Sequence, residues 1–461
     1  MRKFVAWCVA AVAVTTGTQA QAAWYRASSR HFVIYAESNP DRLRNFAVRL
    51  EKYDQAVRAV MHYDDAPVGD GNRLTVFVLP SVSAVQKMAG DKSGFVAGFY
   101  QPQVSGSLAF VPKSAGGREW EGDMTADTVF FHEYAHHLMM AELDAVYPEW
   151  LVEGFAEFME TAQFDKDGSV VLGTAPAFRA WGLTRGQSIP LKDLLSGNYN
   201  SSKMSNEQRE ASLYGLAWLL THYLYMDEKR SGQLSHYLGL LSSGATPAAG
   251  AQGAFGEVGQ LDHDLTAYKN QRSILAMRIP ASKAQPGTID VRALSAGGSA
   301  MVSLRAELKR NAFKSDLEPL AVRVRTVEHQ FPGDELTEAT LAEAELRTGH
   351  FEAAEAAADR ALAVDPRSTE ALILKGQAVE ERAKGTAGNT RSAQFDRARS
   401  IFGAANKIDT EDPEPLYEFY RSYLLEGIRP TPDAISAMHY ASDLVPQALR
   451  TQDEFRNCLS E

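Results

Sequence analysis

The sequence predicts an α+β fold, in which a small α/β sheet layer and a helical lobe are followed by an all-α solenoid of helical repeats. Three observations lead to this prediction. Short runs of β-branched and aromatic residues alternate with helical periods before residue 118. Apolar residues at helical spacing dominate residues 119–280, and small residues recur at fixed intervals after residue 335. The 461 residues suffice for two or three domains with their own cores.

Residues 1–22 have the composition of a secretory signal peptide. Arg2 and Lys3 precede an apolar run over residues 4–14, and Ala20 and Ala22 form an A-x-A cleavage site. The apolar run is too short to span a bilayer. We therefore expect an exported protein, periplasmic or secreted, with no membrane span after cleavage of the signal peptide.

The charge balance argues against nucleic acid and anionic membrane surfaces as partners. The net charge is −11 at pH 7, and loss of Arg2 and Lys3 makes it more negative. The two cysteines, Cys8 and Cys458, would be separated by cleavage of the signal peptide, so no intrachain disulfide is expected.

Residues 23–118 are expected to form the N-terminal α/β part of a catalytic domain. Period-two alternation predicts strands, and apolar residues at helical spacing predict helices. We predict strands over residues 31–36 and 74–79, helices over 40–62 and 81–88, and a β-ribbon formed by 94–100 and 107–111.

One hexapeptide in the following lobe, residues 119–280, carries the chemistry. His132 and His136 are four residues apart, so on a helix both imidazoles lie on one face and can reach a single ion. Glu133 lies at the edge of that face, where its carboxylate can hold a metal-bound water without being a ligand. This is the HExxH arrangement of zinc peptidases. Thr125 can cap the N-terminus of the helix.

A third metal ligand is expected downstream, because catalytic zinc takes three protein ligands and keeps a fourth position for water. Pro148 suits the first turn of a second helix. On that helix Glu153, Glu157 and Glu160 share a face, and carboxylates on an apolar side are costly unless they are paired or metal-bound. Glu153 is the predicted third ligand. Glu157 is predicted to accept the free ring N–H of a ligating histidine.

At these residues the chain resembles the gluzincin metallopeptidases. HExxH followed by Trp-Leu-Val-Glu-Gly-Phe-Ala over residues 150–156 is similar to the aminopeptidase-N-like branch. There the glutamate of the second motif is the third zinc ligand, which implies this role for Glu153. The resemblance also implies roles for Glu160, which matches an acid seven residues after the ligand, and for Tyr214, which matches a tyrosine that stabilises the oxyanion.

The resemblance also has a departure. Aminopeptidases carry a Gly-x-Met-Glu-Asn strand that binds the substrate amine, whereas residues 105–112 read Ser-Gly-Ser-Leu-Ala-Phe-Val-Pro, without a glutamate. The chain is therefore more similar to the peptidase-MA-like group of exported bacterial proteins, which often add tetratricopeptide repeats. In gluzincins the edge strand of the sheet pairs with the substrate backbone, and we expect residues 105–111 to do so here.

The rest of the lobe is expected to be α-rich. After a segment that is mostly loop, helices are predicted over residues 214–224, 231–241, 247–255 and 261–273. Trp218 and His222 share a face with Tyr214, and such a face is typical of core packing, which stays an alternative for Tyr214. His137 lies about 100° further round its helix than His136, away from the ion.

The C-terminal half is expected to be helical. Residues 281–334 are predicted to be a linker with a short strand over 288–293 and bridging helices, residues 335–450 tetratricopeptide repeats, and residues 451–461 a tail. Three repeats are predicted, and a degenerate fourth over 301–334 is an alternative. The consensus positions are held by Gly349, Phe351, Ala354, Ala358, Ala361 and Pro366, and later by Ala434, Ala441 and Pro446. Stacked repeats leave a concave groove, which could bind a protein partner or brace the enzyme.

The predicted function is that of an exported zinc-dependent metallopeptidase with one Zn²⁺ per chain and a peptide or protein substrate. Zinc held by His132, His136 and Glu153 would lower the pKa of its water towards ~7. Glu133 would act as general base, and Tyr214 would stabilise the oxyanion, as the resemblance implies. Two alternatives stay open: a zinc amidase that acts on cell-wall peptides, and a repeat-based scaffold protein with a catalytically silent lobe.

Overall fold

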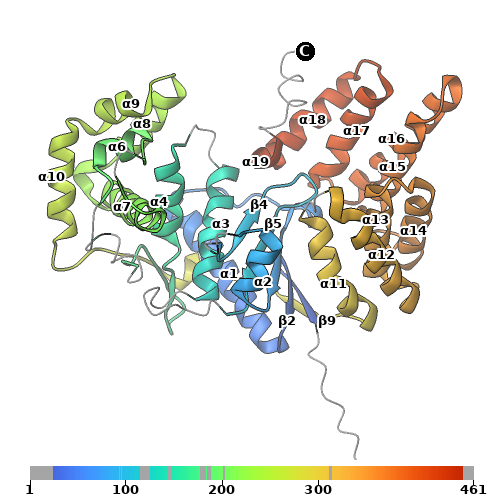
Figure 1. The fold of residues 1–461 in the computed structure, drawn as a ribbon, viewed down its shortest axis with the longest axis horizontal. Helices are drawn as coiled ribbons and strands as arrows, with labels where there is room; N and C mark the ends of the chain where they lie inside the picture. Colours follow the sequence, from blue (N-terminus) through green and yellow to red (C-terminus); the bar gives the residue numbers. More distant parts are fainter. Residues whose placement is uncertain are drawn as a thin grey trace, which may run out of the picture.

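The computed structural model describes residues 24–449, except residues 93, 95, 115–124, 143–146, 177–182, 184–187, 201–202 and 311–313. The predicted signal peptide, the C-terminal tail and both cysteines lie outside the described residues. A six-stranded sheet forms the centre of the molecule, between a helical lobe and an array of helix pairs (Figure 1). None of the described helices combines the length and the apolar character that crossing a membrane requires.

The central sheet has the strand order β4-β5-β3-β2-β1-β9. Its strands are β1 (Trp24–Ser28), β2 (Phe32–Glu37), β3 (Leu74–Leu79), β4 (Phe99–Gln101), β5 (Leu108–Pro112) and β9 (Asp290–Ala293). β2, β3 and β5 run parallel, and the other strands are antiparallel to their neighbours. The sequence patterns did not predict β1. β9 agrees with the short strand predicted over residues 288–293, and it returns to pair with β1.

The predicted edge strand does not lie at the edge. β5 covers most of residues 105–111 and is hydrogen-bonded on both sides, to β3 and to β4. β4 folds back over β5 as a hairpin and is the outermost described strand at this end of the sheet. A hairpin pattern predicts two paired arms, but which arm is outermost depends on which one finds a third strand. The expectation for residues 105–111 was therefore wrong, and β4 takes that place.

Four helices cover the two faces of the sheet: α1 (Pro40–Met61), α2 (Val82–Ala89), α3 (Ala126–Glu142) and α11 (Ala296–Lys309). Because side chains alternate along a strand, Ile34 and Val76 pack in the core with α1 and α3. Tyr35 and Phe77 face the other way, towards α2 and Val302 of α11. The segment expected to form bridging helices thus contributes a layer of the sheet domain.

The helical lobe consists of α4 (Glu149–Met159), α6 (Leu191–Ser196), α7 (Asn206–Met226), α8 (Gln233–Ser242), α9 (Pro247–Phe255) and α10 (Val258–Lys269). A small sheet of β6 (Gln163–Phe164), β7 (Val170–Leu172) and β8 (Met277–Ile279), which was not predicted, joins its two ends. Pro148 is the N-cap residue of α4 and not part of its first turn. At Gly154 the helices α4 and α7 touch: an added Cβ would lie 2.5 Å from the carbonyl oxygen of Ala217.

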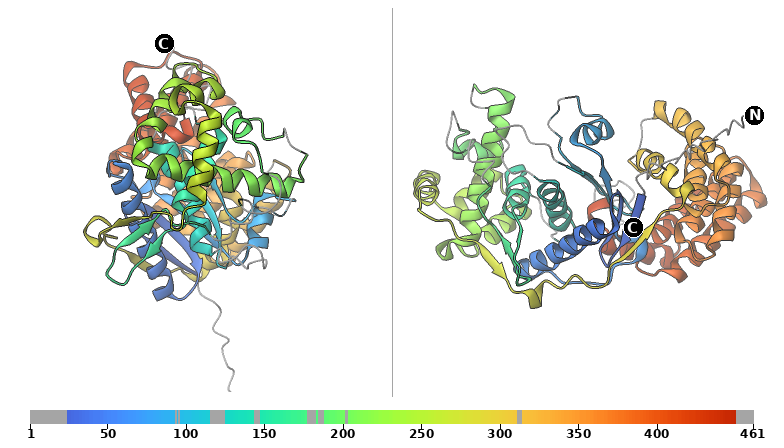
Figure 2. Two further views of the ribbon diagram at one scale, coloured as in Figure 1. Left: turned by 90° about the vertical axis from the view of Figure 1, so that its left-hand side faces the viewer. Right: turned by 90° about the horizontal axis from the view of Figure 1, so that it is seen from below.

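An array of helix pairs lies on the other side of the sheet, as Figure 2 shows from two further directions. They comprise α11 with α12 (Lys314–Gln330), α13 (Glu335–Arg347) with α14 (Phe351–Val364), α15 (Thr369–Lys384) with α16 (Gly388–Ile408), α17 (Pro413–Glu426) with α18 (Pro432–Leu444), and the short α19 (Pro446–Leu449). The first helices of successive pairs, α11, α13, α15 and α17, pack against one another. Ala354, Ala358 and Ala361 are fully buried between helices, as their small size allows.

Candidate metal centre

The helix α3 carries the HExxH motif and is fixed at its start and along its back. The backbone N–H of Thr128 donates a hydrogen bond to Oγ1 of Thr125 at 3.1 Å, which caps the helix as the sequence predicts. Asp127 in the first turn pairs with Arg49 of α1, Nε to Oδ2 at 2.5 Å. Phe130 is fully buried on the side that faces the sheet. α3 also packs against α4.

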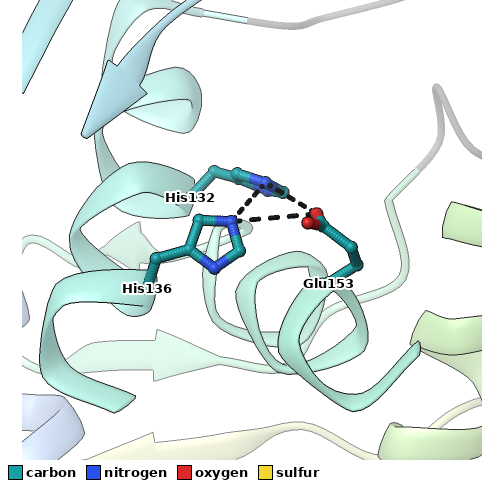
Figure 3. Close-up of side chains that lie close together, drawn as sticks. All are labelled: His132, His136 and Glu153. Atoms are coloured by element: carbon teal, nitrogen blue, oxygen red, sulfur yellow. Dashed lines mark hydrogen bonds and ion pairs between the residues drawn. The ribbon is translucent and has the colours of Figure 1, made fainter. Parts of the chain in front are cut away.

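Two neighbouring helices bring three candidate ligand atoms together. Nε2 of His132 and Nε2 of His136 are 3.1 Å apart. Oε2 of Glu153 on α4 lies 3.4 Å from the first of these nitrogens and 3.7 Å from the second. Figure 3 shows all three side chains pointing into one space between the helices. The three predicted ligands thus meet, although 16 residues and a change of helix separate the second histidine from the glutamate.

These separations match the requirement of a zinc ion. Zinc–ligand bonds of about 2.0–2.1 Å at tetrahedral angles place the ligand atoms about 3.3–3.4 Å from one another. The three observed separations of the ligand atoms, 3.1, 3.4 and 3.7 Å, lie close to that value. Two imidazole nitrogens and one carboxylate oxygen are also donors that zinc prefers. The residues present therefore fit a three-ligand zinc site.

Glu160, and not Glu157, holds the ring of His132. Oε2 of Glu160 lies 2.8 Å from Nδ1 of His132, whereas Oε1 of Glu157 is 3.7 Å away. Both carboxylates are buried, with 3% and 0% of the side chain exposed. Helix geometry allows either residue to reach the ring, and only the angle at which α4 crosses α3 favours the later one. A proton held on Nδ1 leaves the lone pair of Nε2 for the metal.

The electrostatics of the site favour a cation. Burial alone would lower the pKa of His132, but Glu153, Glu160 and Glu157 raise this pKa well above its ordinary value. Burial, together with the neighbouring His132, lowers the pKa of His136 to about 4, so this ring stays neutral. Three carboxylates around two imidazoles thus favour one positive charge at this point, which a divalent ion can supply.

Glu133 lies at the side of the ligand triangle, below the edge strand. Burial raises the pKa of its carboxyl group to about 7, against the opposing influence of His132 and of a hydrogen bond from the backbone of Tyr100 in β4. The backbone at Gly98, just before β4, passes close to α3. A Cβ added to Gly98 would collide with Val129 and lie 3.3 Å from Cγ of Glu133. A carboxylate with a pKa near 7 suits a general base.

Tyr214 also reaches the centre. Its ring lies edge-on to the ring of His132, with the centroids 6.4 Å apart. It belongs to α7, the helix that packs against α4. Sequence reasoning missed Gly98 and Tyr100 at the site, because only the pairing of β4 with β5 carries them over α3.

Two other histidines are structural, as expected. His137 forms a hydrogen bond with the hydroxyl of Tyr100 (2.9 Å) and stacks on Tyr134, away from the ligand triangle. His222 is fully buried, and its Nδ1 lies 2.8 Å from the hydroxyl of Tyr268.

A second cluster behind α3 resembles a metal site, but its carboxylates are hydrogen-bonded to other side chains. Nδ1 of His31 lies 2.8 Å from Oε2 of Glu51 and 3.4 Å from Oδ2 of Asp54. Oδ1 of Asp54 accepts hydrogen bonds from Arg58 (2.9 Å) and from the hydroxyl of Tyr134 (2.8 Å). Burial alone would lower the pKa of His31, but the hydrogen bond to Glu51 and the charges of Glu51 and Asp54 raise this pKa overall. The cluster ties α1 to α3.

Comparison with known proteins identifies one part of the chain. Residues 337–378, which span α13, α14 and most of α15, match the tetratricopeptide repeat. The match confirms the predicted repeats in this region. No protein of curated function matches the chain significantly.

Proposed function

We propose that this protein is an exported zinc-dependent metallopeptidase of gluzincin type, whose tetratricopeptide-repeat region is built onto the catalytic domain. The observation that carries the proposal is the triangle of His132, His136 and Glu153, with sides that suit tetrahedral zinc and with Glu133 beside it. Chance matches to HExxH occur in many chains, but they do not bring a third ligand from another helix to the same point.

Each residue of the site has a role in the proposal. Bound zinc would supply Lewis-acid chemistry, lowering the pKa of a bound water to ~7 and polarising the scissile carbonyl. Glu133 takes a proton from the attacking water and passes it to the leaving nitrogen. Tyr214 donates a hydrogen bond to the carbonyl oxygen as negative charge develops on it. Glu160 keeps the ring of His132 in the tautomer that binds metal through Nε2.

The edge strand β4 would form the upper wall of the substrate cleft. Its inner side pairs with β5, and the backbone of Tyr100 hydrogen-bonds to Glu133. An extended peptide laid along this edge would have its backbone beside the general base. Such a cleft would recognise a substrate through hydrogen bonds to its backbone, which suits a peptide or protein substrate.

The proposal is tested by metal analysis and peptide digestion of the purified full chain. We expect one zinc per chain, cleavage products from a peptide library, and loss of cleavage after chelation. Glu133→Gln should keep the zinc and abolish cleavage. The matched control is Glu142→Gln, because Glu142 lies on the same helix but pairs with Arg58 of α1.

The outcomes separate the alternatives. Zinc retained with no cleavage by the unmodified protein would favour the repeat-based scaffold with a silent lobe. Zinc retained with cleavage confined to cell-wall peptides would favour the amidase. A chain that binds no zinc, or a Glu133→Gln variant that cleaves at the unmodified rate, would overturn the proposal.

A further inference from the structure

The last helix pair of the array makes an intramolecular contact with the loops that border the edge strand. Two turns of the sheet domain enter it. One is the 3₁₀ turn η1 (Asp70–Asn72), and the other connects β4 to β5 over residues 102–107. α17 packs against η1, and α19 packs against the metal helix α3. We call α17, α18 and α19 with these two turns the clasp.

The β4–β5 turn is anchored in the clasp by an apolar side chain. Val104 is 9% exposed and belongs to the same buried cluster as Leu416, Tyr420 and Met438 of α17 and α18. A valine at the tip of a turn on the sheet domain therefore takes part in the core of the array. Gln103 adds a hydrogen bond from its amide to the backbone oxygen of Lys309, at 2.9 Å.

The η1 turn is fitted to the array by two glycines. A Cβ on Gly69 would lie 2.6 Å from Oδ1 of Asp409, and one on Gly71 would collide with the carboxylate of Asp412. Asn72 donates a hydrogen bond from its side-chain amide to the backbone oxygen of Leu444, at 2.9 Å. These contacts leave no room for side chains, so the turn and the array are matched in shape.

Tyr100 joins the clasp to the metal helix. Its hydroxyl forms hydrogen bonds with Ser107 of the β4–β5 turn (3.1 Å) and with His137 of α3 (2.9 Å), and its side chain also bonds to Gln447 of α19. The backbone of the same residue hydrogen-bonds to Glu133. The position of β4 over the site is therefore fixed from α3, from β5 and from the end of the array.

We propose that the clasp is a positioning device of the peptidase, in which Val104 and the hydroxyl of Tyr100 let the repeat array set the place of β4 over the metal centre. The inference rests on the proposed function. In this proposal the last helix pair of the array binds two turns of the same chain. The array thereby supports the strand that borders the substrate cleft, in addition to any binding of other proteins.

The test compares Val104→Ser with the unmodified chain by hydrogen exchange, zinc binding and peptide cleavage. Loss of the anchor should free the β4–β5 turn, so that the amides of Phe99–Gln101 exchange faster while zinc affinity is unchanged. Because a misplacement of about 1 Å can cost about 10²-fold in rate, we expect kcat/KM to fall by about that factor. The conservative variant Val104→Ile keeps an apolar anchor, so it should retain both exchange protection and cleavage.

The matched control is Val324→Ser at the opposite end of the array. Val324 is fully buried in the cluster with Met301 and Leu320 of α11 and α12, so the change weakens the array without touching the clasp. It should leave the exchange of β4 as in the unmodified chain. An equal fall in cleavage in both variants would show a general loss of stability and overturn the proposal, as would unchanged β4 exchange in Val104→Ser.

Failure of the proposed function would look different. If the unmodified chain and Glu133→Gln are equally inactive, the peptidase assignment fails, and the exchange of β4 still decides whether the array positions this strand. If the unmodified chain cleaves peptides and Val104→Ser cleaves them equally well, the positioning role is wrong and the peptidase assignment stands.

Discussion

At the scale of single residues, three glutamates on one face of α4 and its C-cap have three different environments. The carboxylate of Glu153 lies near both imidazoles, and that of Glu160 contacts the ring of His132. Glu157 lies between these two residues in the chain, one helical turn after Glu153, and its side chain is fully buried. The spacing of these residues puts them on one face, but the distances to His132 differ by almost an ångström between Glu160 and Glu157. Their contributions to metal binding should differ accordingly.

We predict that Glu160→Gln weakens zinc binding by about 10–100-fold, because the variant loses the charged partner that orients a ligating histidine. Glu157→Gln is the matched control, with the same change one turn earlier, and should have a clearly smaller effect. Competition titration against a chromogenic chelator measures both affinities. Equal losses in the two variants would contradict the assignment of Glu160.

The proposed peptidase activity should depend on pH through Glu133. Burial raises the pKa of this carboxyl group to about 7, and a general base works only when deprotonated. Activity is therefore present above this pKa and lost as the pH falls through it. A bound cation stabilises the carboxylate, so the acid limb of the zinc-loaded enzyme should lie at or below about pH 7. The measurement is kcat/KM against pH at saturating zinc, and a rate that rises on acidification would exclude Glu133 as the base.

At the scale of elements, the contact between α4 and α7 decides whether the site assembles. Gly154 follows the proposed ligand Glu153 directly and lets α4 approach the backbone of Ala217 on α7, the helix that carries Tyr214. A side chain at this position has no free space, because the neighbouring atoms are backbone as well as the hydroxyl of Thr221.

We predict that Gly154→Ala destabilises the protein by ~1–3 kcal/mol, the usual cost of overpacking. It should also weaken zinc binding, because separating the helices moves Glu153 away from the histidines. Urea denaturation and zinc titration measure the two effects. Gly239→Ala on α8 is the control, since an added Cβ there meets no described atom within 4 Å. Wild-type stability in Gly154→Ala would show that the helices can separate without cost.

At the scale of the whole molecule, the helical-repeat array and the sheet domain share α11. Its buried Val302 and Ala306 cover the sheet face formed by Tyr35 and Phe77. The same helix packs against α12 and α13 of the array. The array therefore protects one face of the sheet from water, and the two parts should not unfold independently.

We predict that Val302→Asp destabilises the whole chain by ~3–5 kcal/mol, because it buries a charge without a partner against the sheet. Val322→Asp makes the same change on α12, where the residue is 53% exposed, and should be nearly neutral. Thermal unfolding followed by circular dichroism and by zinc release measures the cost. Two separate transitions in Val302→Asp, with the helical lobe unaffected, would show that the array is an independent domain.

Local patterns in the chain predict most of the helices, the main parallel strands and the candidate ligands. Period-two and helical patterns depend on neighbours in the chain, so the strand predicted over residues 74–79 agrees with β3 and the helix over 40–62 with α1. His132, Glu133 and His136 follow from spacing along a single helix. The tetratricopeptide pattern is equally local, since each repeat packs mainly on its neighbours.

Local patterns could not show which strand lies at the edge, which glutamate holds His132, or that β9 and α11 complete the sheet domain. Each of these features depends on the packing of segments far apart in the sequence. β5 pairs with β3, α4 packs on α3 so that Glu160 contacts His132, and residues 290–309 pack on the sheet. Periodicity in a chain records which side of an element is buried, but not the element that buries it.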